Sequence, residues 1–282
     1  GGKRIRPVIV LLSGQFGNYD LEKLKYVAVP LELIHMASLV HDDVIDDAET
    51  RRGQLTVKSK WDNRIAMYTG DYIFAKALAV ATELNDPRIH QILSKSIVKM
   101  SIGEIEQIRD FFNMNQSVRH YLLRIRRKTA LLIAISCQLG ALAAGADEKT
   151  VSNLYSYGYN VGMAFQIKDD ILDIVGTEKE LGKPPGSDIK QGNITLPIIY
   201  AMEQAEIQEK LFTEVERIRS LDGQTDVTAF LQMIKESDGI NKAEELAGCY
   251  IAKAIRALEP LPGLKAKQNL TDIAHFVGTR SY

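Results

Sequence analysis

The sequence lacks the features that build disulfide frameworks, zinc sites and membrane spans. It has only two cysteines, Cys137 and Cys249, which stand far apart without the spacing of zinc ligands. We expect both to be buried thiols in a reducing compartment. No apolar run reaches the roughly 18 to 20 residues that a membrane-spanning helix needs, and no signal peptide is recognisable. The net charge is -1, which argues against a general nucleic-acid-binding surface.

Proline and β-type alternation are scarce too. Eight prolines leave long windows in which apolar residues recur at helical spacing. These windows are residues 21–48, 64–84, 88–113, 117–145, 148–175, 194–220, 225–237 and 240–258. The turns between them are too short to be domain linkers, so we predict one all-α domain over residues 1–282, with many helices around a central cavity or core. Because the chain starts GGKRIRP without a methionine, we expect a leading helix to be missing.

Two clusters of acidic residues follow apolar helical segments. In LVHDDVIDDAETRRG, residues 39–53, the acids are Asp42, Asp43, Asp46, Asp47 and Glu49. In FQIKDDILDIVG, residues 165–176, they are Asp169, Asp170 and Asp173. On a helix Asp42 and Asp46 lie one turn apart on one face, and such like-charged pairs destabilise a helix by roughly 0.2–0.5 kcal/mol each. We therefore expect cations nearby that offset the repulsion.

The repetition of the D-D-x-x-D pattern favours a metal site. One copy alone is equally compatible with a solvated helix end, but two copies can face each other across a cavity. Carboxylate oxygens suit Mg²⁺, which shares its coordination shell with substrate phosphates. The residue spacing of an EF-hand loop is absent. The pair His41 and Asp42 would also suit a His-Asp metal hydrolase, but such a site needs further well-spaced histidines, and this chain has only five. We predict that the two clusters hold Mg²⁺ and a diphosphate between them.

Basic residues accompany the acids. They are Lys3, Arg4 and Arg6 in GGKRIRP, the pair Arg51 and Arg52, Lys128 in RIRRKT, and Lys183. Each alone is compatible with a solvated surface charge. The tandem pair after the first acid cluster is more specific, because arginine binds phosphate through a fixed fork of donors and two arginines can address two phosphate groups.

These segments resemble trans-isoprenyl diphosphate synthases over nearly the whole chain. The matching segments are GGKRIRP, LVHDDVIDDAETRRG, GDYIFAKAL, GEIEQI, RKTA, FQIKDDILDI and GKPPGSDIKQGNITLP. Within that family, the likeness is to the catalytic subunits of bacterial two-component heptaprenyl diphosphate synthases. The resemblance implies the all-α isoprenoid synthase fold. It also implies Mg²⁺-dependent, head-to-tail addition of isopentenyl diphosphate to an allylic diphosphate such as farnesyl diphosphate.

The resemblance further implies a role for each motif residue. Three Mg²⁺ ions would be held by Asp42, Asp46 and Asp169, with Asp43 and Asp173 in support. The allylic diphosphate would be held by Arg51, Lys128, Thr129, Gln166 and Lys183. Isopentenyl diphosphate would be held by Lys3, Arg6, His35 and Arg52. The residues expected to be essential for catalysis are Asp42, Asp46, Arg51, Lys128 and Asp169.

Two departures from the family pattern concern one loop. Many relatives have lysine where this chain has Asn193, which removes a phosphate contact from the loop that closes over the site. An insertion, Pro184-Pro185-Gly186, also lies in this loop. Both put the loop's role in doubt.

Two small residues bear on product length. In this family bulky side chains above the first acid cluster block the tunnel into which the product grows, whereas Ala37 and Ser38 stand there in this chain. One helix turn rises about 5.4 Å, close to one isoprene unit, so we predict a product longer than farnesyl, near C35. The same residues are also compatible with close helix packing.

The resemblance implies a partner as well. We expect a heterodimer with a smaller component I subunit, or a homodimer, with the helices at 64–84 and 88–113 as candidate contact surfaces. We further expect a cytoplasmic enzyme that binds no nucleic acid and whose product supplies the side chain of menaquinone.

Three alternatives stay open. A terpene cyclase shares the fold, but its second metal motif usually reads N-D-x-x-S-x-x-x-E, and this chain has DDILD. A non-catalytic regulatory subunit would lose acidic residues that are complete here. A homodimeric synthase of geranylgeranyl, hexaprenyl or octaprenyl diphosphate is the more serious alternative.

Overall fold

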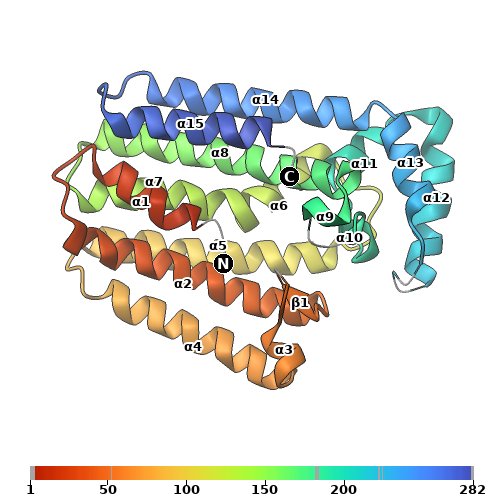
Figure 1. Cartoon of the computed structure of the whole chain (residues 1–282), viewed down its shortest axis with the longest axis horizontal. Helices are drawn as coiled ribbons and strands as arrows, with labels where there is room; N and C mark the ends of the chain where they lie inside the picture. Colours follow the sequence, from red (N-terminus) through yellow and green to blue (C-terminus); the bar gives the residue numbers. More distant parts are fainter. Residues whose placement is uncertain (1–3, 52, 182–183, 222, 224, 281–282) are drawn as a thin grey trace. The chain divides into compact units, whose positions relative to one another are not determined.

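The chain is helical almost throughout (Figure 1). The computed structural model describes residues 4–51, 53–181, 184–221, 223 and 225–280. It forms two compact units. The first unit comprises Gly1–Ile97, Leu132–Gly158 and Ala257–Asp272, and the second comprises Val98–Leu131, Tyr159–Arg256 and Ile273–Tyr282. The predicted all-α fold is confirmed, while the assignment of residues 1–282 to a single domain stays a prediction.

The first unit contains the N-terminal helices and a short hairpin. Its complete elements are α1 (Ile5–Gly14), α2 (Leu21–Ile45), β1 (Thr50–Arg51), β2 (Gln54–Leu55), α3 (Val57–Lys60) and α4 (Asn63–Ala81). It also takes the start of α5 (Pro87–Arg109), most of α7 (Leu131–Ala143), and parts of α8 (Glu148–Val175) and α15 (Lys265–Thr279).

Side-chain caps set where the helices of the first unit begin. The Asp20 carboxylate accepts the backbone N–H groups of Glu22 and Lys23 and starts α2. Asp62 accepts the N–H of Ile65 and starts α4. An N-cap of this kind satisfies donors that have no partner inside the helix and is worth about 1 kcal/mol. The two capped helices therefore begin where the sequence provides an aspartate.

The α1, α2 and α4 helices pack side by side in the first unit (Figure 1). Glycines allow two of these close approaches. A Cβ at Gly14 of α1 would lie 2.5 Å from Leu24 Cδ1 of α2, and one at Gly70 of α4 would lie 2.2 Å from His41 Nε2. The core between these helices is aliphatic and includes the fully buried Leu31 of α2. This packing fixes α2, the helix that leads into the first acid cluster.

The second unit contains the remaining helices. Its complete elements are α6 (Val118–Ile125), η1 (Arg126–Ala130), α9 (Glu178–Leu181), α10 (Ser187–Lys190), α11 (Leu196–Ala201), α12 (Ala205–Ser220) and α13 (Thr228–Glu236). It also holds the end of α5, the end of α8 and most of α14 (Gly239–Leu258). The α13 helix packs against α11 and α12 (Figure 1). The fully buried Phe230 of α13 and Tyr121 of α6 are among the largest core side chains.

The predicted windows needed four corrections. The α1 and α15 helices were not predicted, the window 194–220 is interrupted between α11 and α12, and the window 117–145 contains the π-helical turn η1. A short hairpin, β1–β2, pairs Thr50 with Leu55 and was not predicted either.

Cys137 is buried as expected, but Cys249 is exposed, so the prediction of a buried thiol was wrong for Cys249. Among the helices described, none is long and apolar enough to cross a membrane.

Candidate functional site

The first acid cluster surrounds the C-terminus of α2. The helix ends at Ile45, and the N–H of Asp46 closes it by donating to the Asp42 carbonyl at 2.8 Å. Asp42 and Asp46 are half-buried, so each carboxylate retains access to solvent. Asp43 is turned inward, with only 5% of its surface exposed. Neighbouring aspartates of this motif therefore have different environments.

Cations offset the repulsion between these acids, as the sequence predicted. Arg51 Nε donates to Asp43 Oδ1 at 2.6 Å, and Lys58 Nζ pairs with Asp47. The short β1–β2 hairpin holds Arg51 in place, because Arg51 pairs with Gln54 in its ladder. A charge-assisted hydrogen bond to a buried carboxylate is stronger than one between neutral groups. Arg51, expected to bind diphosphate, thus has an internal partner in the free chain.

The second acid cluster occupies the last turns of α8. Asp169 is half-buried and pairs with Arg280, whose guanidinium lies 4.4 Å from the centre of the Phe165 ring. Asp173 is 3% exposed, and its Oδ2 accepts the N–H of Asp188 at 3.1 Å. The Asp173 side chain therefore anchors the start of α10, although the sequence predicted it as a supporting metal ligand.

Asp170 lies between these two residues and faces the interior. Its Oδ2 accepts the Tyr121 hydroxyl at 2.6 Å, and its Oδ1 accepts Gln166 Nε2 at 2.8 Å. Burial raises the pKa of Asp170 well above its ordinary value, and the charge of Asp188 raises it further, while the Tyr121 and Gln166 hydrogen bonds oppose the rise. The two hydrogen bonds thus compensate part of the cost of burying the carboxyl group.

The π-helical turn η1 carries two of the predicted diphosphate ligands. Lys128 Nζ donates to Glu104 Oε2 of α5 at 2.9 Å, and Thr129 Oγ1 donates to Gln166 Oε1 of α8 at 2.6 Å. A Cβ at Gly103 would lie 2.8 Å from Arg127 Cβ, so glycine permits the close approach of α5 to the turn. The structure therefore places Lys128, Thr129 and Gln166 together in the second unit.

The remaining predicted residues lie in several places. Arg6 lies in α1, and His35 lies in α2 two turns before Asp42; both are half-buried. Ala37 is fully buried, and the Ser38 hydroxyl donates to the His35 carbonyl at 2.9 Å. Lys3, Arg52 and Lys183 lie outside the described residues, so the structure says nothing of their predicted roles.

The carboxylates fit Mg²⁺ in their chemistry. Asp42, Asp46 and Asp169 offer oxygen ligands that remain partly accessible, and Mg²⁺ prefers such hard donors. Asp43 and Asp173 have an oxygen engaged by Arg51 and Asp188, respectively. Within the described residues, no group of three or more His, Cys, Asp or Glu side chains is close enough to hold a metal.

Comparison with known proteins decides the family. Residues 1–234 match the polyprenyl synthetase family. The chain belongs to this family. It is 55% identical to heptaprenyl diphosphate synthase component 2 of Bacillus subtilis over 282 residues, which is 100% of this chain and 80% of that protein. The predicted family and the predicted likeness to a component II subunit are confirmed.

Solved structures of this family agree with the fold. The crystal structure of heptaprenyl diphosphate synthase from Staphylococcus aureus matches with a TM-score of 0.93 at 43% identity, covering 100% of this chain and 88% of that one. A polyprenyl synthase from Caulobacter crescentus CB15, crystallised with calcium and isoprenyl diphosphate, matches with a TM-score of 0.93 at 32% identity, covering 100% and 86%. The isoprenoid synthase fold predicted for this polyprenyl synthetase is thereby confirmed.

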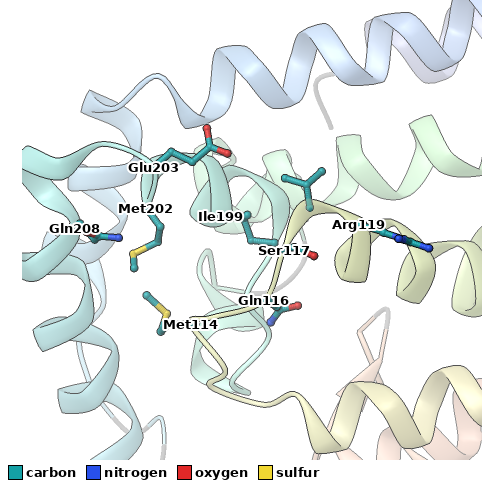
Figure 2. Close-up of a pocket in the computed structure, with 9 residues that line it drawn as sticks. Met114, Gln116, Ser117, Arg119, Ile199, Met202, Glu203 and Gln208 are labelled. Carbon is teal, nitrogen blue, oxygen red and sulfur yellow. The ribbon is translucent and has the colours of Figure 1, made fainter.

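Two cavities of this polyprenyl synthetase lie away from the residues above. One, of about 490 Å³ in the second unit, is drawn in Figure 2, where Met114 and Met202 point into the same space. The other, of about 320 Å³, lies in the first unit between α4 and α5. None of the predicted site residues lines either cavity. The clusters themselves, and not these hollows, mark the candidate site.

Sequence reasoning assigned no role to three residues that contact the predicted ones. Glu104 pairs with Lys128, Tyr121 with Asp170, and Arg280 with Asp169. Glu104 stands in the segment GEIEQI, which was among the matching motifs and could have directed attention to it. Tyr121 and Arg280 stand outside every motif, so the sequence carried no signal for them.

Proposed function

We propose that this chain is a Mg²⁺-dependent trans-prenyltransferase that adds isopentenyl diphosphate units to an allylic diphosphate such as farnesyl diphosphate. The observation that carries the proposal is the pairing of acids and cations at the ends of two long helices. Asp43 of α2 pairs with Arg51, and Asp169 of α8 pairs with Arg280. Such pairs suit a ligand that carries both phosphates and a divalent metal. The arginines can bind the negative phosphates, and the aspartates can bind the positive metal ion.

In this proposal aspartates of both acid clusters serve as metal ligands. Asp42, Asp46 and Asp169 are the main ligands, Asp43 and Asp173 support them, and three ions are bound per site. Bound Mg²⁺ would supply positive charge against the leaving diphosphate. The calcium and isoprenyl diphosphate named for the Caulobacter crescentus relative support a divalent cation with this substrate class.

The basic residues share the phosphates that the metal does not cover. Arg51, Lys128 and Lys183 hold the allylic diphosphate together with Thr129 and Gln166. Isopentenyl diphosphate is held by Lys3, Arg6, His35 and Arg52. The arginine forks and lysine ammonium groups bind, orient and stabilise the developing negative charge on the departing group.

The reaction has three bond changes. The allylic C–O bond breaks, and its electron pair leaves with the diphosphate. The double bond of isopentenyl diphosphate then forms a carbon–carbon bond to the allylic cation. A proton leaves the adjacent carbon, to the departed diphosphate, and restores a double bond. The protein's part is to position the two substrates and exclude water.

The proposed product is heptaprenyl diphosphate, near C35. The names of the relatives from Bacillus subtilis and Staphylococcus aureus support this length. Ala37 and Ser38, at the two positions where bulky side chains limit product length in this family, are small. Each isoprene unit buries five carbons and gains at most roughly 4 kcal/mol. The product would supply the side chain of menaquinone, and the enzyme would work in the cytoplasm.

The proposed partner is a smaller component I subunit. The component 2 designation of the Bacillus subtilis relative supports such a pairing. Helix α4 of the first unit exposes the large apolar side chains of Ile65, Met67, Tyr68, Tyr72 and Leu78. The α5 part in the second unit exposes Val98, Ile102, Ile105 and Ile108. Exposed apolar side chains on neighbouring turns are typical of protein–protein contact surfaces.

Product analysis tests this proposal. The chain is incubated with farnesyl diphosphate, isopentenyl diphosphate and Mg²⁺, with and without a component I subunit, and the prenyl products are sized. We expect little product from the chain alone and heptaprenyl diphosphate when the subunit is added. A discrete product from the chain alone would instead favour the homodimeric synthase. No prenyl product in either mixture would overturn the proposed function.

A further inference from the structure

Asp170 differs from its neighbour Asp169 in burial and in its partners. The Asp169 side chain is 36% exposed, whereas Asp170 is 3% exposed. Both oxygens of Asp170 accept hydrogen bonds, from the Tyr121 hydroxyl at 2.6 Å and from Gln166 Nε2 at 2.8 Å. Successive residues of a helix are turned by about 100°, so Asp169 and Asp170 point in different directions. The Asp170 carboxylate is therefore directed into the second unit.

The hydrogen bonds of Asp170 continue to the π-helical turn η1. Gln166 Oε1 accepts from Thr129 Oγ1 at 2.6 Å, so Tyr121, Asp170, Gln166 and Thr129 form one unbroken chain. The carboxylate fixes the Gln166 amide, because a flipped amide would turn its oxygen toward Asp170. With Nε2 held on Asp170, Oε1 faces Thr129. The chain therefore ties both α6 and η1 to α8.

One face of α8 makes this attachment. Gly162, Gln166 and Asp170 are four residues apart, which places them above one another on the helix. A Cβ at Gly162 would lie 2.6 Å from Ala130 Cα, so α8 also comes very close to η1 at this point. A π-helical turn is rare, and where it occurs it often lies at a functional site. The stripe on α8 thus contacts the turn at Gly162 and Gln166, and it contacts α6 at Asp170.

We propose that Asp170 is a positioning residue that, together with Tyr121 and Gln166, holds the π-helical turn carrying Lys128. The Lys128 ammonium would then meet the allylic diphosphate at a place set by this attachment. The inference rests on the proposed function, because there Lys128 is a diphosphate ligand. Lys128 Nζ also donates to Glu104 of α5 at 2.9 Å, so a shift of the turn would change this contact. Asp170 acts through the turn and is not itself a metal ligand.

Two variants and a matched control test the inference. Asp170→Asn keeps the size of the side chain but replaces one acceptor by a donor, so it cannot accept both hydrogen bonds. Tyr121→Phe removes one donor and leaves Asp170 unchanged. Tyr250→Phe removes the hydroxyl of another buried tyrosine in the second unit, on α14, and serves as the control. Hydrogen exchange of residues 126–131 and steady-state kinetics are measured for all three.

We expect faster exchange at residues 126–131 in Asp170→Asn and Tyr121→Phe, and unchanged exchange in the control. The KM for farnesyl diphosphate should rise about tenfold, as expected for loss of one buried hydrogen bond, while the KM for isopentenyl diphosphate stays constant. In a Lys128→Ala background, Asp170→Asn should raise this KM by a smaller factor than in the wild type, because Lys128 is one of the groups through which Asp170 acts.

Three results would overturn the inference. The first is unchanged exchange at residues 126–131 in both variants. The second is a full effect of Asp170→Asn in the Lys128→Ala background. The third is weaker Mg²⁺ binding, measured by calorimetry, in Asp170→Asn but not in Tyr121→Phe, which would make Asp170 a ligand. A wild-type chain that makes no prenyl product with component I would overturn the proposed function instead, while the exchange measurement would still decide whether Asp170 holds the turn.

Discussion

Replacement of Gly70 by alanine sets two opposing effects against each other. Alanine favours a helix over glycine by about 1 kcal/mol. However, the new Cβ would lie 2.2 Å from His41 Nε2 and 2.4 Å from Cδ2, far inside the roughly 3.5–4.0 Å of a normal carbon contact. The clash involves the imidazole ring of His41, the residue directly before Asp42 of the first acid cluster.

The His41 ring has little freedom to move away. Its Nε2 donates to the Met67 carbonyl at 3.2 Å and lies 3.3 Å from Asp71 Oδ1. The ring also lies 5.7 Å from the Phe74 ring, measured between centroids. Overpacking of this kind typically costs about 1–3 kcal/mol, and a lost hydrogen bond costs about 1 kcal/mol more. We expect Gly70→Ala to lower the free energy of unfolding by about 1–3 kcal/mol, despite the gain in helix propensity.

Urea unfolding of four proteins and one control variant tests this reasoning. They are the wild type, Gly70→Ala, His41→Ala and the double variant. In the His41→Ala background the clash is gone, so Gly70→Ala should stabilise by up to about 1 kcal/mol. Gly248→Ala is the matched control, because a Cβ on that glycine of α14 meets no atom within 4 Å. Equal destabilisation by Gly70→Ala in both backgrounds would refute the explanation.

Two further predictions concern product length and pH. Ala37→Tyr should shorten the prenyl product, because a ring on this side of α2 would block the growing chain; an unchanged product distribution would contradict the tunnel. Stability should fall above about pH 9, because burial raises the pKa of the Cys137 thiol to about 12 and the pKa values of Tyr121 and Tyr157 well above their ordinary range. There the folded protein keeps protons that the unfolded chain releases, so each group lowers the unfolding free energy by up to about 1.4 kcal/mol per pH unit. Urea unfolding at about pH 8 and about pH 10.5 measures the slope, and a constant free energy would contradict it.

Helices with strong apolar periodicity could be predicted from the sequence. The window 148–175 coincides with α8, and the window 21–48 contains α2. The α15 helix was missed because two of its four fully buried apolar residues are alanines, Ala266 and Ala274, which give a weak signal. The α1 helix was missed because its apolar residues form a continuous run, which periodicity alone does not assign to a helix.

The π-helical turn could not be predicted from local sequence. Nothing in RRKTA distinguishes an i+5 from an i+4 hydrogen-bond pattern. The turn depends on close approaches at Gly103 of α5 and Gly162 of α8, which are distant in sequence and come together only in the folded unit. Its contacts to Glu104 and Gln166 are likewise long-range.

The sequence shows where the acidic residues lie along the chain, but it does not show the environment of each aspartate. Spacing shows which aspartates lie on one helix face, yet it does not show which face packs inward. Asp43, Asp170 and Asp173 prove to be buried, and their oxygens are used by other protein groups. Asp42 and Asp169 retain partial exposure. Tertiary packing therefore separates partly exposed carboxylates from buried ones within a single motif.

In the proposed function, aspartates of both acid clusters take part in Mg²⁺-dependent diphosphate binding. Calorimetry with an unreactive thio analogue of farnesyl diphosphate, with and without Mg²⁺, tests this claim most directly. We predict that Asp42→Asn and Asp169→Asn each weaken Mg²⁺-dependent binding by at least about tenfold, and that the double variant is less than additive, because the two residues share one ligand. Wild-type binding by either single variant would contradict the claim.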